Sequence, residues 1–132
     1  MKYIEVVAAI IRHKEKYLCV QRGVNKYPYI SHKYEFPGGK IEKGESHQQA
    51  LRREIQEELL MDIEVKEHLH TVEHRYPDFT IKMYAYLCTS ANDEYTLTEH
   101  IHGLWLSKNE LERLDWAAAD IPIVQGIMRS KG

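Results

Sequence analysis

Five segments of the chain carry the continuous or alternating apolar pattern of β-strands. They are rich in Val, Ile and Tyr, and polar or turn-forming residues separate them. A short extended piece at residues 34–36 ends before Pro37, which disfavours helix at the residue before it. Residues 22–33 break the pattern and are expected to form an ordered loop. The five predicted strands are residues 3–12, 17–21, 63–76, 79–89 and 103–107, with hairpins joining the first to the second and the third to the fourth.

One segment has the helical period instead. Leu51, Ile55 and Leu59 recur every four residues, and Ser46 followed by Gln49 has the form of a capping box. Helices and strands do not alternate regularly along the chain, so the pattern favours an α+β fold over a doubly wound sheet. Two shorter helical patterns are predicted at residues 109–114 and 121–129.

Composition restricts the possible classes of protein. The chain has 132 residues, which fits one domain, 1–132, with 43% hydrophobic and 29% charged residues. The net charge of -2 argues against a binder of nucleic-acid polymers but leaves open a small anionic ligand. No stretch has the roughly 20 apolar residues of a membrane span or the pattern of a signal peptide. Cys19 and Cys88 are expected to be buried, reduced thiols, which fits a cytoplasmic protein.

Three carboxylates share one face of the helix that begins near Ser46. At 3.6 residues per turn, Glu54, Glu57 and Glu58 fall within an arc of about 100°. Carboxylates at this spacing repel one another, and a bound divalent cation would offset the repulsion. Oxygen ligands without a nearby cysteine favour Mg²⁺, or Mn²⁺ as a substitute, over Zn²⁺. The alternative is a solvated helix face.

The residues before this helix extend the pattern. Gly39 is followed by five residues and Glu45, then by seven residues and the run 53–58, Arg-Glu-Ile-Gln-Glu-Glu. Residues 39–61 thus resemble the Nudix box, G-x5-E-x7-R-E-U-x-E-E-x-G-U, where U is a bulky aliphatic residue. The preceding residues 34–42 resemble the MutT-like branch of that family. The one departure is Leu60, which stands where the box has the glycine of a left-handed turn.

The resemblance implies a mixed sheet between helices and a loop–helix–loop motif that hydrolyses nucleoside diphosphates linked to another group. It further implies that Glu54 and Glu57 are catalytic as well as ligands of the metal. Arg53 would orient a carboxylate, and Glu45 would support the loop. Glu99 would be a candidate general base, with a plain surface loop as the alternative. The implied metal ligands are Glu54, Glu57, Glu58 and the Gly38 carbonyl.

Phosphate contacts are expected from cations near the two glycines. Arg22 ends the second strand, and Lys40 follows Gly39, whose backbone can approach a phosphate closely. Lys33 is a further, less favoured candidate. For any of these cations the alternative is a solvated surface residue.

Asp120 is the candidate for reading the base. The segment around it resembles MutT-like proteins, which place a polar residue that recognises the base just before a helix that begins with proline. In the guanine-type proteins that residue is asparagine, and Asp120 takes its position here. A carboxylate suits an exocyclic amino group such as that of cytosine. The alternative is an N-cap of the helix. Phe36, Tyr76 and Tyr84 are candidates to wall the base, although strand aromatics are often plain core.

The sequence therefore predicts an Mg²⁺-dependent hydrolase that converts a nucleoside triphosphate to the monophosphate and pyrophosphate, with preference for a cytidine-type or oxidised base. An 8-oxo-dGTP diphosphatase of the MutT type is the first alternative. A non-catalytic nucleotide sensor is the second. A zinc site at His68, His70 and His74 is disfavoured, because no cysteine or acidic cluster joins them. The pattern is compatible with a monomer or a homodimer.

Overall fold

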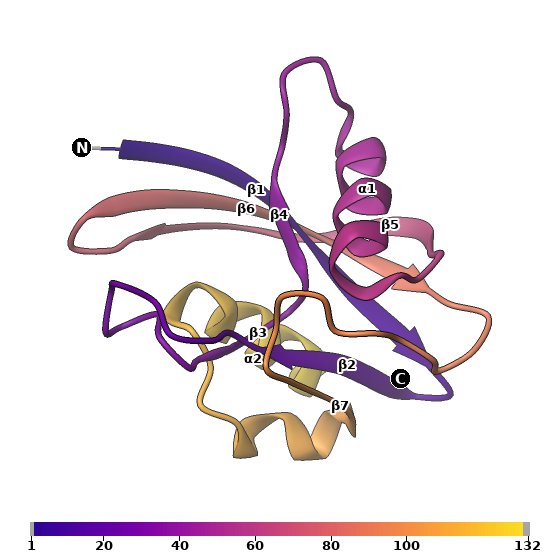
Figure 1. Cartoon of the computed structure of the whole chain (residues 1–132). Coiled ribbons are helices and arrows are strands. Elements are labelled where there is room, and N and C mark those ends of the chain that lie inside the picture. Colours follow the sequence, from indigo (N-terminus) through magenta and orange to yellow (C-terminus); the bar gives the residue numbers. More distant parts are fainter. Residues whose placement is uncertain (1, 131–132) are drawn as a thin grey trace.

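A parallel pair of long strands forms the centre of the sheet. The computed structural model describes residues 2–130, and in it β1 (Lys2–His13) runs beside β6 (Phe79–Thr89) in a register that places Lys2 opposite Phe79 and Arg12 opposite Thr89. The antiparallel β5 (Glu64–Arg75) covers the outer edge of β6 (Figure 1). The predicted hairpin at Pro77 and Asp78 is therefore confirmed.

The other edge of β1 is shared by two strands. β2 (Lys16–Gln21) pairs with β1 only next to their turn, and β4 (Gly38–Lys40) then takes the edge opposite Val6–Ala8. β2 continues away from β1 as the centre of a second arm. That arm is completed by β3 (Tyr34–Glu35) and β7 (His102–Ser107).

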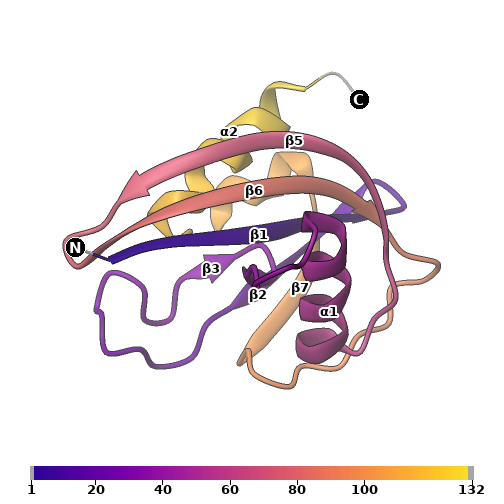
Figure 2. The same ribbon diagram turned by 90° about the horizontal axis from the view of Figure 1, so that it is seen from above.

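Helices lie on both faces of the seven-stranded sheet. Figure 2 shows α1 (His47–Leu59) and α2 (Ile121–Arg129) on opposite sides of the strands. Since successive side chains of a strand point to opposite faces, β1 contributes to two cores. Ala8 and Ile10 pack toward α2, and Val7, Ala9 and Ile11 pack toward α1. The predicted α+β fold with a mixed sheet between helices is confirmed.

The two shorter helical patterns are both found, whereas β4 and a second 3₁₀-helix were not predicted. The helical pattern at 109–114 forms a 3₁₀-helix, η1 (Lys108–Arg113), and a second one, η2 (Ala118–Asp120), leads into α2. Cys19 and Cys88 are free and fully buried, and burial raises the pKa of both thiols to about 12. Within residues 2–130, no helix is long and apolar enough to cross a membrane.

The ends of α1 follow from local chemistry. The Ser46 hydroxyl accepts a hydrogen bond from the Gln49 backbone, and the Gln49 side chain accepts one from the Ser46 backbone, as the predicted capping box requires. At the other end Leu60 has φ 52° and ψ 40°, and its N–H donates to the Gln56 carbonyl. Leucine thus adopts the left-handed conformation that the glycine of the box would adopt, at a cost of about 1–2 kcal/mol.

Replacing Leu60 with glycine should relieve this strain. Leu60 is 55% exposed, so little packing is lost, and we expect Leu60→Gly to raise the free energy of unfolding by about 1 kcal/mol. Urea denaturation followed by circular dichroism measures the change. Leu60→Ala keeps the β-carbon and is the control, expected within about 0.5 kcal/mol of the wild type. A destabilised glycine variant would contradict the strain argument.

Candidate active site

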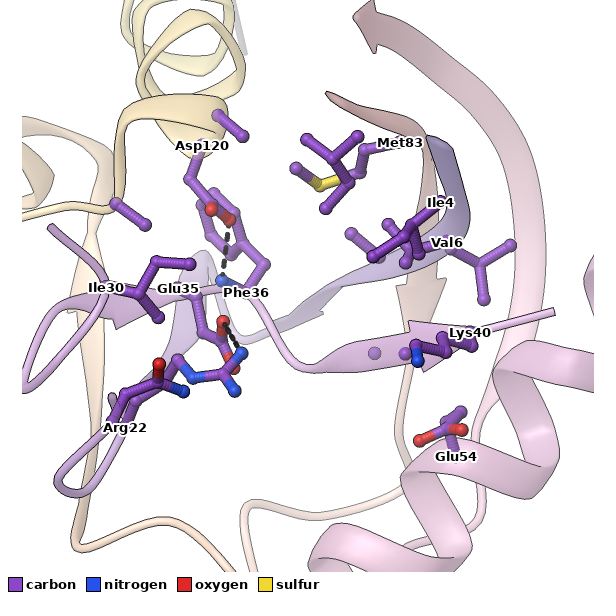
Figure 3. A pocket seen from close by; sticks show the side chains of 18 of the residues that line it. Ile4, Val6, Arg22, Ile30, Glu35, Phe36, Lys40, Glu54, Met83 and Asp120 are labelled. Atoms are coloured by element: carbon purple, nitrogen blue, oxygen red, sulfur yellow. Dashed lines mark hydrogen bonds and ion pairs between the residues drawn. The ribbon is translucent and has the colours of Figure 1, made fainter. Parts of the chain in front are cut away.

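A cavity of about 920 Å³ opens between the two arms of the sheet, α1 and the start of α2. Figure 3 shows its organisation: Phe36 and Asp120 lie at one end, and Lys40 and Glu54 lie at the other. Ile4, Val6 and Met83 form an apolar wall between the ends. Such a cavity suits a ligand with a charged end and a flat, partly apolar end.

The three carboxylates of α1 line the charged end but differ in burial. Glu58 is 7% exposed, whereas the side chain of Glu54 is 15% and that of Glu57 is 56% exposed. Burial, together with the charges of Glu35, Glu54 and Glu99, raises the pKa of Glu58 to about 8. Burial also raises the pKa of Glu54. The fold therefore holds negative charges close together where water screens them poorly.

Arg53 links the loop before α1 to these carboxylates. Its Nε and Nη2 donate to the two Glu45 oxygens at 2.7 and 2.9 Å, and Nη2 also donates to the Lys40 carbonyl at 3.0 Å. Nη1 donates to Glu54 Oε1 at 2.8 Å and contacts both Glu57 oxygens at 3.4 Å. The bonds from Arg53 to Glu45, together with one from the Glu42 N–H, lower the pKa of Glu45 to about 2. The predicted orienting contact of Arg53 and the loop contact of Glu45 are both present.

Gly38 and Gly39 allow backbone and carboxylates to meet closely. A β-carbon at Gly38 would lie 2.0 Å from the Val7 carbonyl oxygen, and one at Gly39 would lie 2.5 Å from the Glu54 carboxylate carbon. The Gly38 N–H donates to Glu58 Oε1 at 3.2 Å. Only glycine fits at either position without displacing its neighbour.

The donors at this end suit a hard divalent cation. Three carboxylates and nearby backbone carbonyls are oxygen ligands, and their mutual repulsion is what a cation would offset. As residues 2–130 stand, no three His, Cys, Asp or Glu side chains already converge as a metal-binding group. Of the three carboxylates, Glu57 has the most exposed side chain and so has the most freedom to turn toward a bound cation.

The opposite end is built around Asp120. Asp120 is 4% exposed, and its Oδ1 accepts a hydrogen bond from the Phe36 N–H at 3.0 Å. Asp120 is the N-cap residue of α2, as the alternative from the sequence expects, but its side chain makes no capping hydrogen bond. Phe36 packs against Trp116, and the Tyr76 hydroxyl accepts a hydrogen bond from the Ala119 N–H. Phe36, Tyr76 and Asp120 all line the cavity.

Glu35 is a cavity residue that the sequence analysis did not single out. Its Oε1 accepts from Arg22 Nη1 at 3.3 Å, and its Oε2 contacts His100 Nε2 at 3.0 Å. All three side chains line the cavity, as does Lys40 at the charged end. The alternation of residues 34–36 indicates that Glu35 and Phe36 point to opposite sides of the strand. It does not reveal the partners of Glu35, because these are distant in sequence.

Glu99 enters the cavity from a segment that is fixed to α1. The Thr98 hydroxyl donates to the Glu57 carbonyl at 2.7 Å, and the Thr98 N–H donates to the Glu58 carbonyl at 3.1 Å. These are carbonyls of the last turn of a helix, which have no partner within it. Glu99 lines the cavity, and its charge raises the pKa of Glu54 and Glu58.

Two predictions about cavity residues are wrong. Lys33 does not line the cavity, because its Nζ forms an ion pair with Asp115 at 2.9 Å. Tyr84 does not line it either: it packs against His47 on the α1 side of the sheet. His68 contacts Tyr86, whereas His74 contacts Tyr76.

Comparison with known proteins identifies the family. The model of a family described as "NUDIX domain" matches residues 1–126. The chain belongs to the Nudix family. The predicted resemblance is thus confirmed, and the helix with its three carboxylates is the Nudix helix of this chain.

The Nudix relatives include proteins of two named activities. The chain is 35% identical to the CTP pyrophosphohydrolase of Escherichia coli K12, over 97% of this chain and 93% of the relative. It is 30% identical to the 8-oxo-dGTP diphosphatase of the same organism, over 98% and 99%. The solution structure of the E. coli ORF135 protein matches with a TM-score of 0.81 and 35% identity, over 97% of this chain and 90% of that one. The prediction of a Nudix hydrolase is confirmed.

Gly39→Ala should disrupt the charged end. Its β-carbon would displace the Glu54 carboxylate, and we expect phosphoanhydride hydrolysis to fall by about 100-fold. Gly126→Ala in α2 is the control, because its β-carbon would meet nothing within 4 Å. That control should remain fully active and gain about 0.5–1 kcal/mol in stability. An active Gly39→Ala protein would show that Glu54 does not need its present position.

Asp120→Asn should change how stability depends on pH. Burial, with a contribution from Glu35, raises the pKa of Asp120 well above its usual value. Because the folded pKa exceeds the unfolded one, the stability that the protonated carboxyl supplies is complete below about pH 4 and is lost as the pH rises. The amide stays neutral and can still accept the Phe36 N–H. We expect the free energy of unfolding of the variant, relative to wild type, to increase with pH.

Urea denaturation of both proteins at several pH values between about 4 and 8 measures this difference. Asp115→Asn, at a side chain that is 73% exposed, is the control and should change stability by no more than about 1 kcal/mol. A difference between Asp120→Asn and wild type that stays constant with pH would refute the raised pKa.

Proposed function

We propose that the protein is an Mg²⁺-dependent nucleoside triphosphate pyrophosphohydrolase that prefers CTP, dCTP or an oxidised pyrimidine nucleotide. The proposal is carried by one observation: the cavity joins the carboxylates of α1 at one end to the buried Asp120 carboxyl at the other. Water cleaves the triphosphate to a monophosphate and pyrophosphate. The relative named CTP pyrophosphohydrolase supports this substrate class.

Asp120 supports the choice of an amino-bearing base. Among the described residues, only Phe36 hydrogen-bonds to its carboxyl, and that bond uses Oδ1. Oδ2 is left for the ligand. An exocyclic amino group that donates to Oδ2 would stabilise the ionised carboxylate, which burial alone disfavours. Cytosine presents such a group on the edge that pairs in nucleic acids.

The charged end supplies the groups for phosphate chemistry. Glu54, Glu57, Glu58 and the Gly38 carbonyl would hold Mg²⁺, or Mn²⁺ in its place. When bound, the cation would neutralise phosphate charge and lower the pKa of a water molecule. Arg53 orients Glu54 and Glu57 through the hydrogen bonds described above. Glu99, exposed at the cavity and close to these carboxylates, is the proposed general base.

Three further residues are proposed to hold the phosphates. Arg22 and Lys40 line the cavity and carry positive charge. Gly39 also lines the cavity, and it has no side chain that would keep a phosphate away from its backbone. Arg22 already bonds Glu35, so its guanidinium keeps further N–H donors for a phosphate oxygen. Lys40 is exposed and can reach an incoming anion without losing an ion pair.

The proposed role is to limit or cleanse a pool of free nucleotides. The two buried, unpaired thiols fit a reducing compartment, and we propose the cytoplasm. The 8-oxo-dGTP diphosphatase activity is the alternative, favoured by the 30% identical relative of that name. A non-catalytic sensor is disfavoured, because Glu45 and all three α1 carboxylates of the box are present.

A panel of normal and oxidised nucleoside triphosphates tests the proposal. Purified protein is incubated with Mg²⁺ and each nucleotide, and pyrophosphate and phosphate are measured separately. We expect pyrophosphate release with the highest kcat/KM for cytidine-type nucleotides, and a shift toward guanine nucleotides in Asp120→Asn. Preference of the wild type for 8-oxo-dGTP would reject the assignment of Asp120, and no turnover of any nucleotide would reject the enzyme.

Glu57→Gln tests the charged end in the same assay. The side chain is 56% exposed and contacts Arg53 only at 3.4 Å, so the fold should be unchanged. We expect kcat to fall by roughly 100-fold or more. Circular dichroism and thermal melting check the fold. Full activity would mean that the reaction does not use this carboxylate.

A further inference from the structure

His100 is a buried histidine with one satisfied and one unsatisfied nitrogen. Its side chain is 5% exposed, and Nε2 lies 3.0 Å from Glu35 Oε2. Because an ionised carboxylate only accepts hydrogen bonds, Nε2 carries the proton and donates. In the neutral ring Nδ1 is then an acceptor, and among residues 2–130 it has no hydrogen-bond partner.

An unpaired buried nitrogen makes His100 a poor residue for stability alone. A buried polar atom without a partner destabilises the folded state, whereas an apolar side chain of similar size would avoid that cost. His102, two residues further, has no such defect: it is exposed, and its Nδ1 lies within hydrogen-bonding distance of the Tyr34 hydroxyl. The feature that distinguishes His100 is therefore its bond to Glu35 in the cavity.

Glu35 lines the cavity between its two ends. Its side chain is 17% exposed and is held from two sides, by Arg22 at Oε1 and by His100 at Oε2. Its charge acts on both ends, because it raises the pKa of Glu58 and that of Asp120. The next residue, Phe36, binds Asp120 through its N–H. The position of Glu35 thus affects Arg22 and the region around Asp120.

We propose that His100 is a positioning residue: its Nε2–H holds the Glu35 carboxylate in place, so that Glu35 and Arg22 present a fixed surface to the nucleotide, with Arg22 at its phosphates. The inference rests on the proposed function. His100 itself need not touch the ligand, since its side chain is almost fully covered. Its contribution is to ligand binding and not to the hydrolytic step, which takes place at the carboxylates of α1.

Kinetics of His100→Leu, with the nucleotide that the wild type prefers, test the proposal. We expect KM to rise by about tenfold, as for the loss of a hydrogen bond to a charged group, and kcat to stay within about twofold. The melting temperature should change little, because removal of the unpaired Nδ1 offsets the loss of the hydrogen bond to Glu35. His100→Gln, whose amide can donate in place of Nε2, should recover most of the wild-type KM. His102→Gln is the matched control and should behave as wild type.

A double-mutant cycle with Glu35→Ala separates positioning from a structural role. If His100 acts through Glu35, His100→Leu should add no increase in KM once the carboxylate is gone. Additive effects would overturn the proposal, as would a loss confined to kcat or a His100→Leu protein with the wild-type KM. Unfolding of both His100→Leu and His100→Gln would also overturn it, because His100 would then be a folding residue.

Calorimetric binding of CMP distinguishes this failure from a failure of the proposed function. CMP is the expected product, and its Kd reports on binding of the nucleoside and its phosphate without any chemistry. A wild-type protein that hydrolyses no nucleotide rejects the proposed function. If the same protein binds CMP about tenfold more tightly than His100→Leu does, the positioning role still holds. Equal affinities would reject the positioning role.

Discussion

The candidate active site depends most on the hydrogen bonds of the Arg53 guanidinium. It is a rigid, planar group with five N–H donors, and here they reach a loop carboxylate, a backbone carbonyl and two helix carboxylates. The bidentate contact with Glu45 fixes the segment between β4 and α1. The contacts with Glu54 and Glu57 fix the helix face. One side chain thus sets the distance between the glycine backbone and the carboxylates that it meets.

Accumulated negative charge is the physical cost of this arrangement. The fold places Glu54, Glu58 and Glu99 together and buries part of the group, which raises the pKa of Glu54 and Glu58. The net charge of -2 gives no sign of this, because it averages a strongly acidic end with cations elsewhere. A divalent cation between a polyanionic ligand and this end of the cavity would offset the repulsion between them.

Much of the architecture could be predicted from the sequence, because strand alternation, the capping box and the box spacing are local. The same periodicity could have excluded Tyr84 from the cavity. Phe79, Ile81 and Met83 alternate on the α2 side of β6, so Tyr84 must face α1. The departure at Leu60 proved harmless to the turn, because leucine accepts the left-handed conformation at a modest energetic cost.

The rest of the site depends on contacts between residues distant in sequence. Glu57 and Glu58 are adjacent and identical in type, yet one is exposed and the other buried by the sheet. The Glu35–His100 contact joins residues 65 positions apart, and the Phe36–Asp120 contact joins residues 84 apart. Lys33 illustrates the converse: a cation near the cavity in sequence is bound by Asp115, 82 positions away. No local pattern contains such pairings.

The parallel register of β1 and β6 has a consequence for the order of assembly. β1 shares only two residue positions with β2 but pairs with β6 along its length, from Lys2 to Arg12. A ribosome therefore releases β1, β4 and α1 before it has made β6, the long partner strand of β1. Non-local pairing of this kind is slow, because a long loop must close first. α1 is among the first segments synthesised, yet the cavity that it lines can form only after Asp120 has left the ribosome.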